Sequence, residues 1–465
     1  MARRSTSRLQ FLRALPVLFV LLGLAVLGLV VFANQTKVLM SFNVLEYNID
    51  LPVLGGSPLV ATSEEQSLVA VSEEQSPPVV GYAISVTACQ PNDERLDQAA
   101  ILLYSIHLNS RRNPDSGSKY DYMAYAFVHP EAANCTDILT TIGYEVQVRE
   151  SPVLKEHIQG RLKEFVHEAS CCQEKEFLKL YSYTLVDHSV VVHLDLDCLV
   201  LQPLDDLFDS MMEGPNSVAR QRLPLQWDKN NTNLPDEIEA FFTRDYNLVD
   251  PGRRQPHQIG IQGGFIVVKP DMDVFNQYRE TIIDGNYTRS QGWGGELEYG
   301  GYYGAAQIQG LCAYFFGAVR PRKTLELNRC YYNFMADAPR DEEEGNKCRT
   351  LEEDCQDCRN VGFEEIKTIH FTLCQKPWWC DAHESNMDRK SDLGGEEGFE
   401  LCLAAHKQWF RTRYLLEKEW SEKDAYYTMT PDVGELGQEA THGFCQRKHI
   451  TEYVPMQFPK KRIEL

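Results

Sequence analysis

Basic residues are scarce in this sequence. Lysine and arginine number 46 against 67 aspartates and glutamates, so the formal net charge is −21. A folded chain this acidic repels phosphate backbones, which argues against nucleic-acid binding. Because 43% of the residues are hydrophobic and 11% are aromatic, the composition excludes a disordered tail and a collagen-like repeat. A core built from 465 residues needs no metal or disulfide to hold it together.

Long uncharged runs are also rare, and the one at residues 14–33 stands out. A helix of that length spans about 30 Å, the thickness of a bilayer core. Several arginines precede the run and only Lys37 follows it closely, so the positive-inside rule keeps the N-terminus in the cytoplasm. We predict a cytoplasmic tail at 1–13 and an uncleaved transmembrane anchor at 14–34. A signal peptide cleaved after Ala33 is the alternative, but its apolar core is usually only about 7–15 residues long.

The segment that follows the apolar run is of low complexity, is acidic and contains proline. The tandem copies SEEQSLVAV and SEEQSPPVV start at Ser63 and Ser72, and they suit a flexible stem at 35–80. The chain after the anchor then faces a lumen or the exterior. Fourteen cysteines agree with this oxidising side of the membrane. Usable N-glycosylation sequons support the same topology weakly, and they start at Asn134, Asn230 and Asn286.

Strand and helix patterns alternate in the folded part at 81–385. Buried strands are predicted at 81–89, 120–129, 143–148, 189–194 and 259–268. Helical spacing predicts helices at 96–107, capped by Asn92 or Asp93, and at 174–187. The alternation predicts an α/β fold with a mostly parallel central sheet and helices on both faces, and ligands bind beyond the carboxyl ends of such strands. A C-terminal extension follows at 386–465.

An acidic, cysteine-bearing insertion is predicted at 338–360. It holds Cys348, Cys355 and Cys358, and Cys330 comes shortly before it. These four cysteines fit either disulfides that pin a surface loop or a zinc site built on the C-x-x-C pair. We favour disulfides because the other spacings are irregular and the compartment is oxidising. The sequence does not determine their pairing.

The chemistry of the chain is concentrated at 190–208, VVVHLDLDCLVLQPLDDLF. An apolar strand there delivers Asp195 and Asp197. Positions i and i+2 of a strand share a face, so both carboxylates can converge on one cation. Oxygen ligands suit Mn²⁺ or Mg²⁺, and such an ion can neutralise a departing diphosphate. An ordinary strand-end turn is the plain alternative.

Four segments between residues 81 and 378 resemble glycosyltransferase family eight, the glycogenin-like retaining enzymes of the GT-A fold. They are VTAC at 86–89 with the helix after it, EFLKLYSYTL at 176–185, HLDLDCLVL at 193–201 and HFTLCQKPW at 370–378. The resemblance implies a GT-A nucleotide-diphospho-sugar transferase fold preceded by the transmembrane helix. It places Thr87 in the uridine-binding start of the fold and Lys179 near the phosphates. It further implies that the metal ligands are Asp195, Asp197 and His370.

The resemblance of HFTLCQKPW to the family's motif also implies that Lys376 contacts the diphosphate. Taken separately, His370 is more typical of a buried structural histidine and Lys376 of a surface lysine. A neutral imidazole is nevertheless a reasonable partner for carboxylates on Mn²⁺. A lysine beside a leaving diphosphate supplies positive charge on an otherwise acidic protein.

Two further segments resemble the family's sugar pocket. IQGGFIVVKPDMDVF, from residue 261, places Gln262, Gly263 and Gly264 where small residues line that pocket, and glycines let backbone approach the donor closely. A β-bulge in a core strand is the structural alternative. QIQGLCAYFF, from residue 307, has Ile308 where the family usually has an acid, while Gln309 keeps the amide. Leu373 is a second departure, at a position where glycine is common.

Aromatic residues gather in the glycine-rich stretch GWGGELEYGGYYG at 292–304. Trp293, Tyr299, Tyr302 and Tyr303 suit a platform for a sugar acceptor or a lid, and they suit the packing of an irregular loop equally well. Both interpretations stay open at this stage.

The resemblance implies a metal-dependent transferase that moves a hexose from a UDP-sugar to a glycan or glycoconjugate acceptor, with retention of configuration. Double displacement needs a carboxylate nucleophile, and none is evident, so we favour same-face attack with Lys376 on the departing UDP and Gln309 or Gln262 orienting the sugar. Anchor, stem and family imply a single-pass type II protein of the Golgi or ER membrane with a lumenal catalytic domain. Rival hypotheses are a phosphatase-type D-x-D and a membrane-anchored carbohydrate-binding or scaffold protein with a decayed site.

Overall fold

The computed structural model describes residues 77–90, 94–167, 172–227, 230–248, 255–296, 299–342, 344–380, 395–430, 441–447 and 451–465. Contacts divide the chain into Met1–Glu73 and Glu74–Leu465, and every described residue belongs to the second unit. The predicted tail, anchor and most of the stem therefore lie outside the described residues, as do the predicted caps Asn92 and Asp93. Within the described ranges, no helix combines the length and the apolar character that a membrane span requires.

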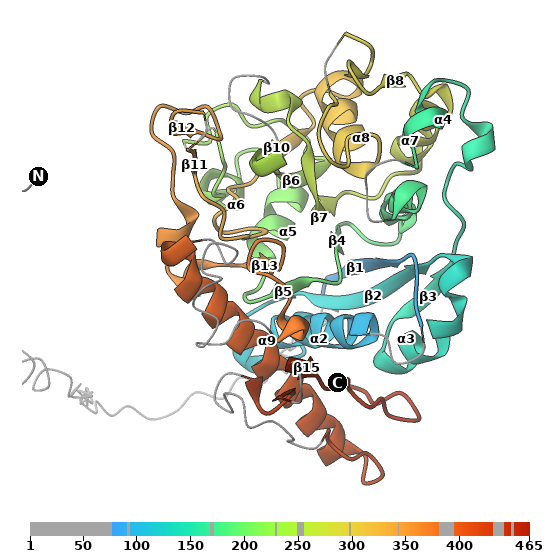
Figure 1. Ribbon diagram of the computed structural model, residues 1–465, viewed down its shortest axis with the longest axis vertical. Helices are drawn as coiled ribbons and strands as arrows, with labels where there is room; N and C mark the ends of the chain where they lie inside the picture. Colours follow the sequence, from blue (N-terminus) through green and yellow to red (C-terminus); the bar gives the residue numbers. More distant parts are fainter. Residues whose placement is uncertain are drawn as a thin grey trace, which may run out of the picture. The chain divides into compact units, whose positions relative to one another are not determined.

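A seven-stranded sheet forms the centre of this unit, in the order β10-β6-β7-β4-β1-β2-β3 (Figure 1). Its strands are β1 (Val79–Val86), β2 (Asp121–Val128), β3 (Glu145–Val148), β4 (Val191–Leu194), β6 (Ala240–Arg244), β7 (Ile261–Val268) and β10 (Thr324–Glu326). Strand β1 pairs in parallel with β2 and β4, β2 with β3, and β6 with β10. Strand β7 runs antiparallel to β4 and β6. The sheet is thus mostly parallel, as the alternating sequence pattern predicts.

The five predicted strands are confirmed as β1, β2, β3, β4 and β7, and the helix predicted at 96–107 is α2 (Glu94–Leu108). The segment predicted as a helix at 174–187 forms η4 (Gln173–Thr184), a 3₁₀-helix. Its buried residues are Phe177, Leu178, Lys179, Leu180, Ser182 and Tyr183. Residues three apart lie in line in a 3₁₀-helix, so Phe177, Leu180 and Tyr183 form one row. These three side chains pack in the second core cluster.

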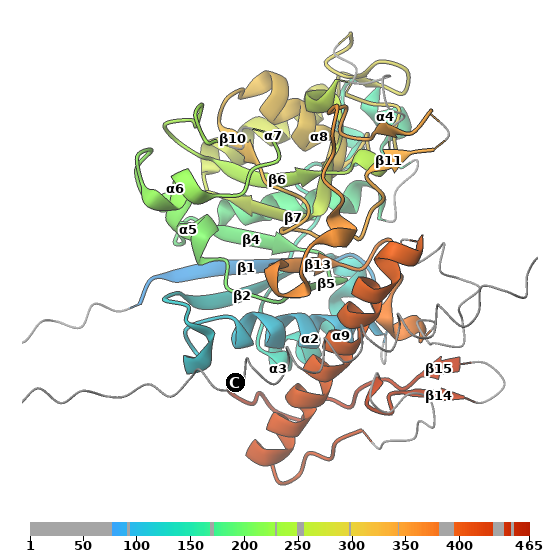
Figure 2. The same ribbon diagram turned by 90° about the vertical axis from the view of Figure 1, so that its left-hand side faces the viewer.

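Helices cover both faces of the sheet. Tyr82, Ile84 and Val86 of β1 lie in one core cluster with α2, α3 (Thr136–Ile142) and α9 (Gly395–Lys423), while Ala83 lies in a second cluster with η4, α7 (Met272–Asp284) and α8 (Ile308–Tyr314). Figures 1 and 2 show α2, α3 and α9 on one side of the sheet and α7 and α8 on the other. Successive side chains of a strand point to opposite faces, so the alternation in β1 serves two cores.

Shorter elements connect these layers. The other α-helices are α4 (Leu162–Phe165), α5 (Asp205–Met212) and α6 (Val218–Arg222), and a π-helix, η7 (Phe315–Val319), continues α8. The other 3₁₀-helices are η1 (Pro114–Ser116), η2 (Pro130–Cys135), η3 (Lys155–His157), η5 (Tyr246–Leu248), η6 (Pro256–Gln258), η8 (Cys358–Asn360), η9 (Phe363–Glu365) and η10 (Pro377–Trp379). Strands outside the main sheet form the pairs β5 (Cys198–Val200) with β13 (Thr368–His370), β8 (Tyr287–Thr288) with β9 (Gly292–Trp293), β11 (Arg340–Asp341) with β12 (Lys347–Cys348), and β14 (Cys445–Arg447) with β15 (Thr451–Tyr453).

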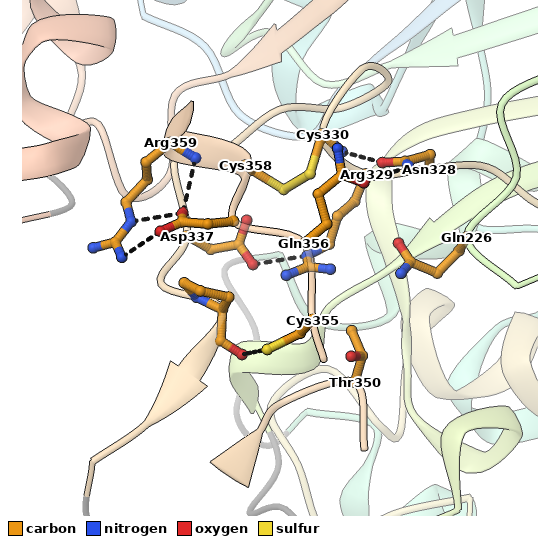
Figure 3. The surroundings of a disulfide bond; sticks show 12 residues. Gln226, Asn328, Arg329, Cys330, Asp337, Thr350, Cys355, Gln356, Cys358 and Arg359 are labelled. Atoms are coloured by element: carbon orange, nitrogen blue, oxygen red, sulfur yellow. Dashed lines mark hydrogen bonds and ion pairs between the residues drawn. A yellow bond between two sulfur atoms is a disulfide. The ribbon is translucent and has the colours of Figure 1, made fainter. Parts of the chain in front are cut away.

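Disulfides pin the acidic insertion, as predicted. Cys330 pairs with Cys358 and Cys348 with Cys355, so these four cysteines do not form the alternative zinc site. Figure 3 shows the Cys330–Cys358 bond beside Arg329 and Asp337. Both of these side chains are buried, and Arg329 Nε donates to Asp337 Oδ2 at 2.9 Å. The Cys330–Cys358 bond therefore ties the insertion to the chain before it, next to a buried ion pair, while Cys348–Cys355 closes a loop inside the insertion.

The C-terminal extension packs on the same unit through α9. Trp409, Phe410 and Trp420 of this helix share the core cluster that contains α2. Tyr104 of α2 donates its hydroxyl to Glu419 Oε2 at 2.8 Å. Two further disulfides, Cys374–Cys402 and Cys380–Cys445, connect the extension to the segment that follows β13.

Candidate active site

The two predicted aspartates lie at the carboxyl end of β4. Residue Leu194 ends this strand and pairs with Phe265 of β7, and Asp195 N then donates to Gly264 O at 2.9 Å. Strand β4 is buried along its whole length, so the chain meets solvent only where the acids begin. In a parallel sheet this edge is where ligands bind. Thr87 lies at the same edge, because it follows the neighbouring parallel strand β1.

Strand pairing brings His370 to Asp197. In the antiparallel pair of β5 and β13, His370 lies opposite Cys198, and Phe371 N donates to Asp197 O at 2.8 Å. The imidazole Nε2 of His370 then lies 3.2 Å from Asp197 Oδ1. The amine of Lys376, a few residues further on, contacts Asp197 Oδ2. Asp197, His370 and Lys376, three of the sequence-predicted site residues, therefore meet in space. His370 and Lys376 come from a part of the chain far from Asp197.

Asp197 is held in its charged form. Burial alone would raise the pKa of this carboxyl, but the His370 imidazole and then the Lys376 ammonium hold the pKa well below its usual range. A carboxylate that stays charged at all physiological pH values suits either a structural ion pair or a metal ligand.

The donor atoms around Asp197 fit a divalent metal ion. One ligand atom each from Asp197, Cys198 and His370 lie within 4.8 Å of one another. His370 Nδ1 is buried and has no hydrogen-bond partner among the described residues. Carboxylate and imidazole together suit Mn²⁺, whereas Cys198 adds a soft donor that sequence reasoning passed over. Its position directly after Asp197 is the sequence feature that could have identified it as a ligand.

Asp195 lies in a second group, around Lys179. The Lys179 amine is 2.8 Å from Asp195 Oδ1 and 3.4 Å from Glu176 Oε2, and it donates to Gly263 O at 3.0 Å. Burial alone would lower the pKa of Lys179, but Asp195 and then Glu176 raise it above its usual value. Asp195 as a metal ligand and Lys179 as a phosphate contact therefore stay predictions, since in this arrangement the two side chains neutralise each other.

Gly263 and Gly264 leave space for the side chains of this site. A Cβ on Gly264 would lie 2.3 Å from His370 Cε1, and one on Gly263 would lie 2.9 Å from Ile308 Cγ2 and 3.4 Å from Lys179 Nζ. Gln262 Oε1 accepts from Gly264 N at 2.6 Å. The register of β6 with β7 shifts between the pairs Phe242–Ile266 and Arg244–Ile261, so the extra residues lie on β7 and include both glycines. The glycines therefore admit the side chains of the site, and the bulge interpretation agrees with the irregular pairing of the same stretch of β7.

Gln309 lies near the same glycines from the opposite side. Its Cγ is 3.6 Å from the Cβ position of Gly263, and its Oε1 is 2.5 Å from the Cβ position of Gly304. Gly304 has φ of +74° and leaves the space that the amide occupies. Gln309 thus lies between the glycine strand and the loop at 299–307.

The predicted aromatic group divides into two pairs. Trp293 and Tyr299 are 0% and 4% exposed, and they are core residues. Tyr302 and Tyr303 line a cavity of about 510 Å³, together with Phe165, Tyr287, Asn247, Leu248, Arg289 and Gln307 among others. The packing interpretation therefore holds for Trp293 and Tyr299, and the acceptor platform or lid stays a prediction for Tyr302 and Tyr303.

Asp245 is a site residue that sequence reasoning missed. It follows β6, whose carboxyl end lies at the same edge of the sheet as that of β4, because both strands run antiparallel to β7. Burial and then the charge of Asp337 raise the pKa of Asp245 to about 6, whereas Asn247 N–H, His370 and Gln262 act in the opposite direction. The sequence feature that could have identified it is the strand AFFTR, which is followed directly by this acid.

The described residues define an α/β protein with an acid, imidazole and lysine cluster at the carboxyl edge of a mostly parallel sheet. No family model and no curated protein matches the chain. Among solved structures it is similar to mouse xyloside xylosyltransferase 1 in its apo form, with 10% identity, coverage of 63% of this chain and 98% of that chain, and a TM-score of 0.37.

Two more solved structures are similar at the same level. The galactosyltransferase LgtC, in complex with donor and acceptor sugar analogs, has 14% identity over 70% of this chain and 95% of that chain, with a TM-score of 0.35. The apo glycosyltransferase GlyE of Streptococcus pneumoniae TIGR4 has 13% identity over 75% of this chain and 64% of that chain, with a TM-score of 0.37. All three neighbours are named as glycosyltransferases.

Proposed function

We propose that this chain is a metal-dependent retaining glycosyltransferase that moves a hexose from a UDP-sugar to a glycan or glycoconjugate acceptor. One observation carries it: Asp197, His370 and Lys376 meet at the carboxyl edge of the sheet. Their order and spacing along the chain are those of the family-eight resemblance. A phosphatase-type D-x-D usually continues with Thr or Val, whereas Cys198 follows Asp197 here.

Each side chain has a role in this proposal. Asp195, Asp197 and His370 hold a Mn²⁺ or Mg²⁺ ion, which when bound neutralises charge on the diphosphate. Lys376 contacts the departing diphosphate, and Lys179 supplies a second positive charge near Asp195. Thr87 lies beside the uridine. Gln262, Gln309 and the backbone of Gly263 and Gly264 orient the sugar.

Retention follows from attack on the same face of the sugar from which UDP departs. The acceptor hydroxyl forms the new bond to the anomeric carbon as the bond to the phosphate oxygen breaks, and that oxygen takes the hydroxyl proton. Lys376 stabilises the negative charge that UDP gains. Ile308 stands where the family usually has an acid. The Asp245 carboxyl interacts with the Gln262 side chain.

A screen of UDP-hexoses with Mn²⁺ tests this proposal. We expect one UDP-sugar to be hydrolysed slowly without acceptor, and to be transferred when acceptor glycosides are added, with product masses that identify the sugar. EDTA abolishes both reactions. NMR of the product is expected to show a retained anomer. An inverted anomer contradicts same-face attack, and the absence of turnover with every UDP-hexose contradicts the enzyme.

The cavity lined by Tyr302 and Tyr303 fits the acceptor. Its volume of about 510 Å³ lies within the range of roughly 300–1,000 Å³ that is usual for small-molecule sites. Aromatic rings with amide and hydroxyl groups around them suit the faces and edges of a sugar. The wall residue Gly304 packs on Gln309, and the wall residue Asn247 donates its N–H to Asp245. The cavity therefore adjoins the groups to which we assign the donor sugar.

Replacing Tyr303 tests the acceptor cavity. Tyr303 is 51% exposed, so Tyr303→Ala is expected to leave the fold intact. We expect KM for acceptor glycosides to rise about tenfold, the equivalent of one aromatic contact, while hydrolysis of the donor without acceptor is unchanged. Tyr426→Ala is the matched control, since Tyr426 is 93% exposed and lies outside the cavity. An unchanged acceptor KM in Tyr303→Ala removes the cavity from the acceptor site.

We further propose a type II, single-pass protein of the Golgi or ER membrane with the site on the lumenal side. The uncharged run at 14–33 and the arginines before it support this topology. The disulfides among the described residues agree with an oxidising compartment.

A further inference from the structure

The segment that carries Lys376 has an unusual backbone. Gln375 and Cys380, which bracket Lys376 and η10, have φ of +59° and +55°. Side chains with a Cβ rarely adopt this left-handed region. Such conformations persist only where the surroundings over-determine them. The turn that brings Lys376 to Asp197 therefore depends on what packs against it.

One face of α9 contacts this turn at successive positions. Cys402, His406 and Trp409 follow the i, i+4, i+7 spacing that places residues on one side of a helix. Cys402 forms the disulfide with Cys374. His406 Nε2 lies 2.8 Å from Cys374 O and 3.3 Å from Gln375 O. The Trp409 ring packs on Trp378, with ring centroids 5.7 Å apart.

The central contact is a neutral histidine. His406 is 3% exposed, and burial lowers its pKa to about 4 although the two carbonyls act in the opposite direction. A carbonyl only accepts hydrogen bonds, so Nε2 carries the proton and donates it to the turn. The His406 ring also packs on Phe371, with centroids 5.6 Å apart, and Phe371 N donates to Asp197 O. His406 thus contacts both ends of the stretch between His370 and Lys376.

We propose that His406 is a positioning residue, which together with the Cys374–Cys402 disulfide holds the turn in the conformation that directs Lys376 toward Asp197. The C-terminal extension then completes the site, because α9 connects the turn to α2 through Glu419 and Tyr104. The role of the positioned amine as a diphosphate contact rests on the proposed function. The positioning itself does not.

Amine labelling tests the positioning without any ligand. Lys376 is 21% exposed in its side chain and paired with Asp197, whereas Lys418 on the same helix as His406 is 51% exposed. In His406→Ala, we expect acetic anhydride to label Lys376 about tenfold faster relative to Lys418, as read by peptide mass spectrometry. His406→Gln retains a donor and is expected to restore part of the protection. Leu416→Ala, which removes buried volume from α9 further along, controls for general loosening of the helix.

A double-mutant cycle tests the consequence for the ligand. With UDP and Mn²⁺ in calorimetry, His406→Ala is expected to raise the Kd of UDP about tenfold, roughly the loss of one hydrogen-bonded contact. In the Lys376→Ala background it is expected to add nothing, because the residue acts through that lysine. Unchanged labelling of Lys376, or additive effects on UDP, overturns the positioning role. If the wild type binds no UDP while the labelling result holds, the donor assignment fails and the positioning stands.

Discussion

Asp197→Asn is expected to lose Mn²⁺ binding and all Mn²⁺-dependent turnover of the donor. Asp197 contacts both His370 and Lys376. An amide keeps the shape of the carboxylate but removes the charge that makes it a metal ligand. Changes to groups that only support metal ligands already cost about 10–100-fold in metal affinity, so we expect a loss of at least about a hundredfold here.

Electron paramagnetic resonance of free Mn²⁺ measures this loss directly, apart from any enzyme assay. Asp187→Asn is the matched control, because Asp187 is an exposed aspartate that precedes the same strand. It is expected to bind Mn²⁺ as the wild type does. Wild-type affinity in Asp197→Asn would remove the metal from this site, and equal UDP-sugar hydrolysis in both variants would remove the enzyme.

Much of the site was predictable because it depends on the chain's local order. Apolar strands that end in polar residues identify the carboxyl edge of a parallel sheet, and this rule located Asp195 and Asp197. The resemblance supplied His370 and Lys376, which lie far along the chain. Their approach to Asp197 depends on the antiparallel pairing of β13 with β5. Both strands are three residues long, too short for periodicity to predict their register.

What the sequence did not predict arises from tertiary contacts. Asp245 was missed because β6, a short strand, was not recognised. The ion pair of Lys179 with Asp195 separates the two aspartates into different groups, which the i, i+2 rule on a strand does not foresee. His406 lies in the extension beyond the resemblance, and only the packing of α9 gives it a connection to the site. The left-handed Gln375 likewise has no sequence signal, since glutamine does not favour that conformation.

Gly264→Ala is expected to disable the metal site through a single added methyl group. The new Cβ would lie 2.3 Å from His370 Cε1 and 2.7 Å from His370 Nδ1, well inside van der Waals contact. Gly264 O also accepts from Asp195 N, so strand β7 has little freedom to withdraw. The imidazole must therefore shift from its present position beside Asp197. Overpacking of this kind costs about 1–3 kcal/mol of stability, and we expect Mn²⁺ affinity to fall by about 10–100-fold.

Thermal unfolding and Mn²⁺ binding, measured on the same samples, separate the two effects. Gly214→Ala is the matched control, because no atom lies within 4 Å of its Cβ position, and it is expected to change neither quantity. Combining Gly264→Ala with His370→Ala removes the clash, so the double variant is expected to regain the stability that Gly264→Ala lost while still failing to bind Mn²⁺. If the second substitution instead adds its own full destabilisation, the methyl group does not act on the imidazole. In that case the close approach of His370 to Gly264 has no bearing on the metal.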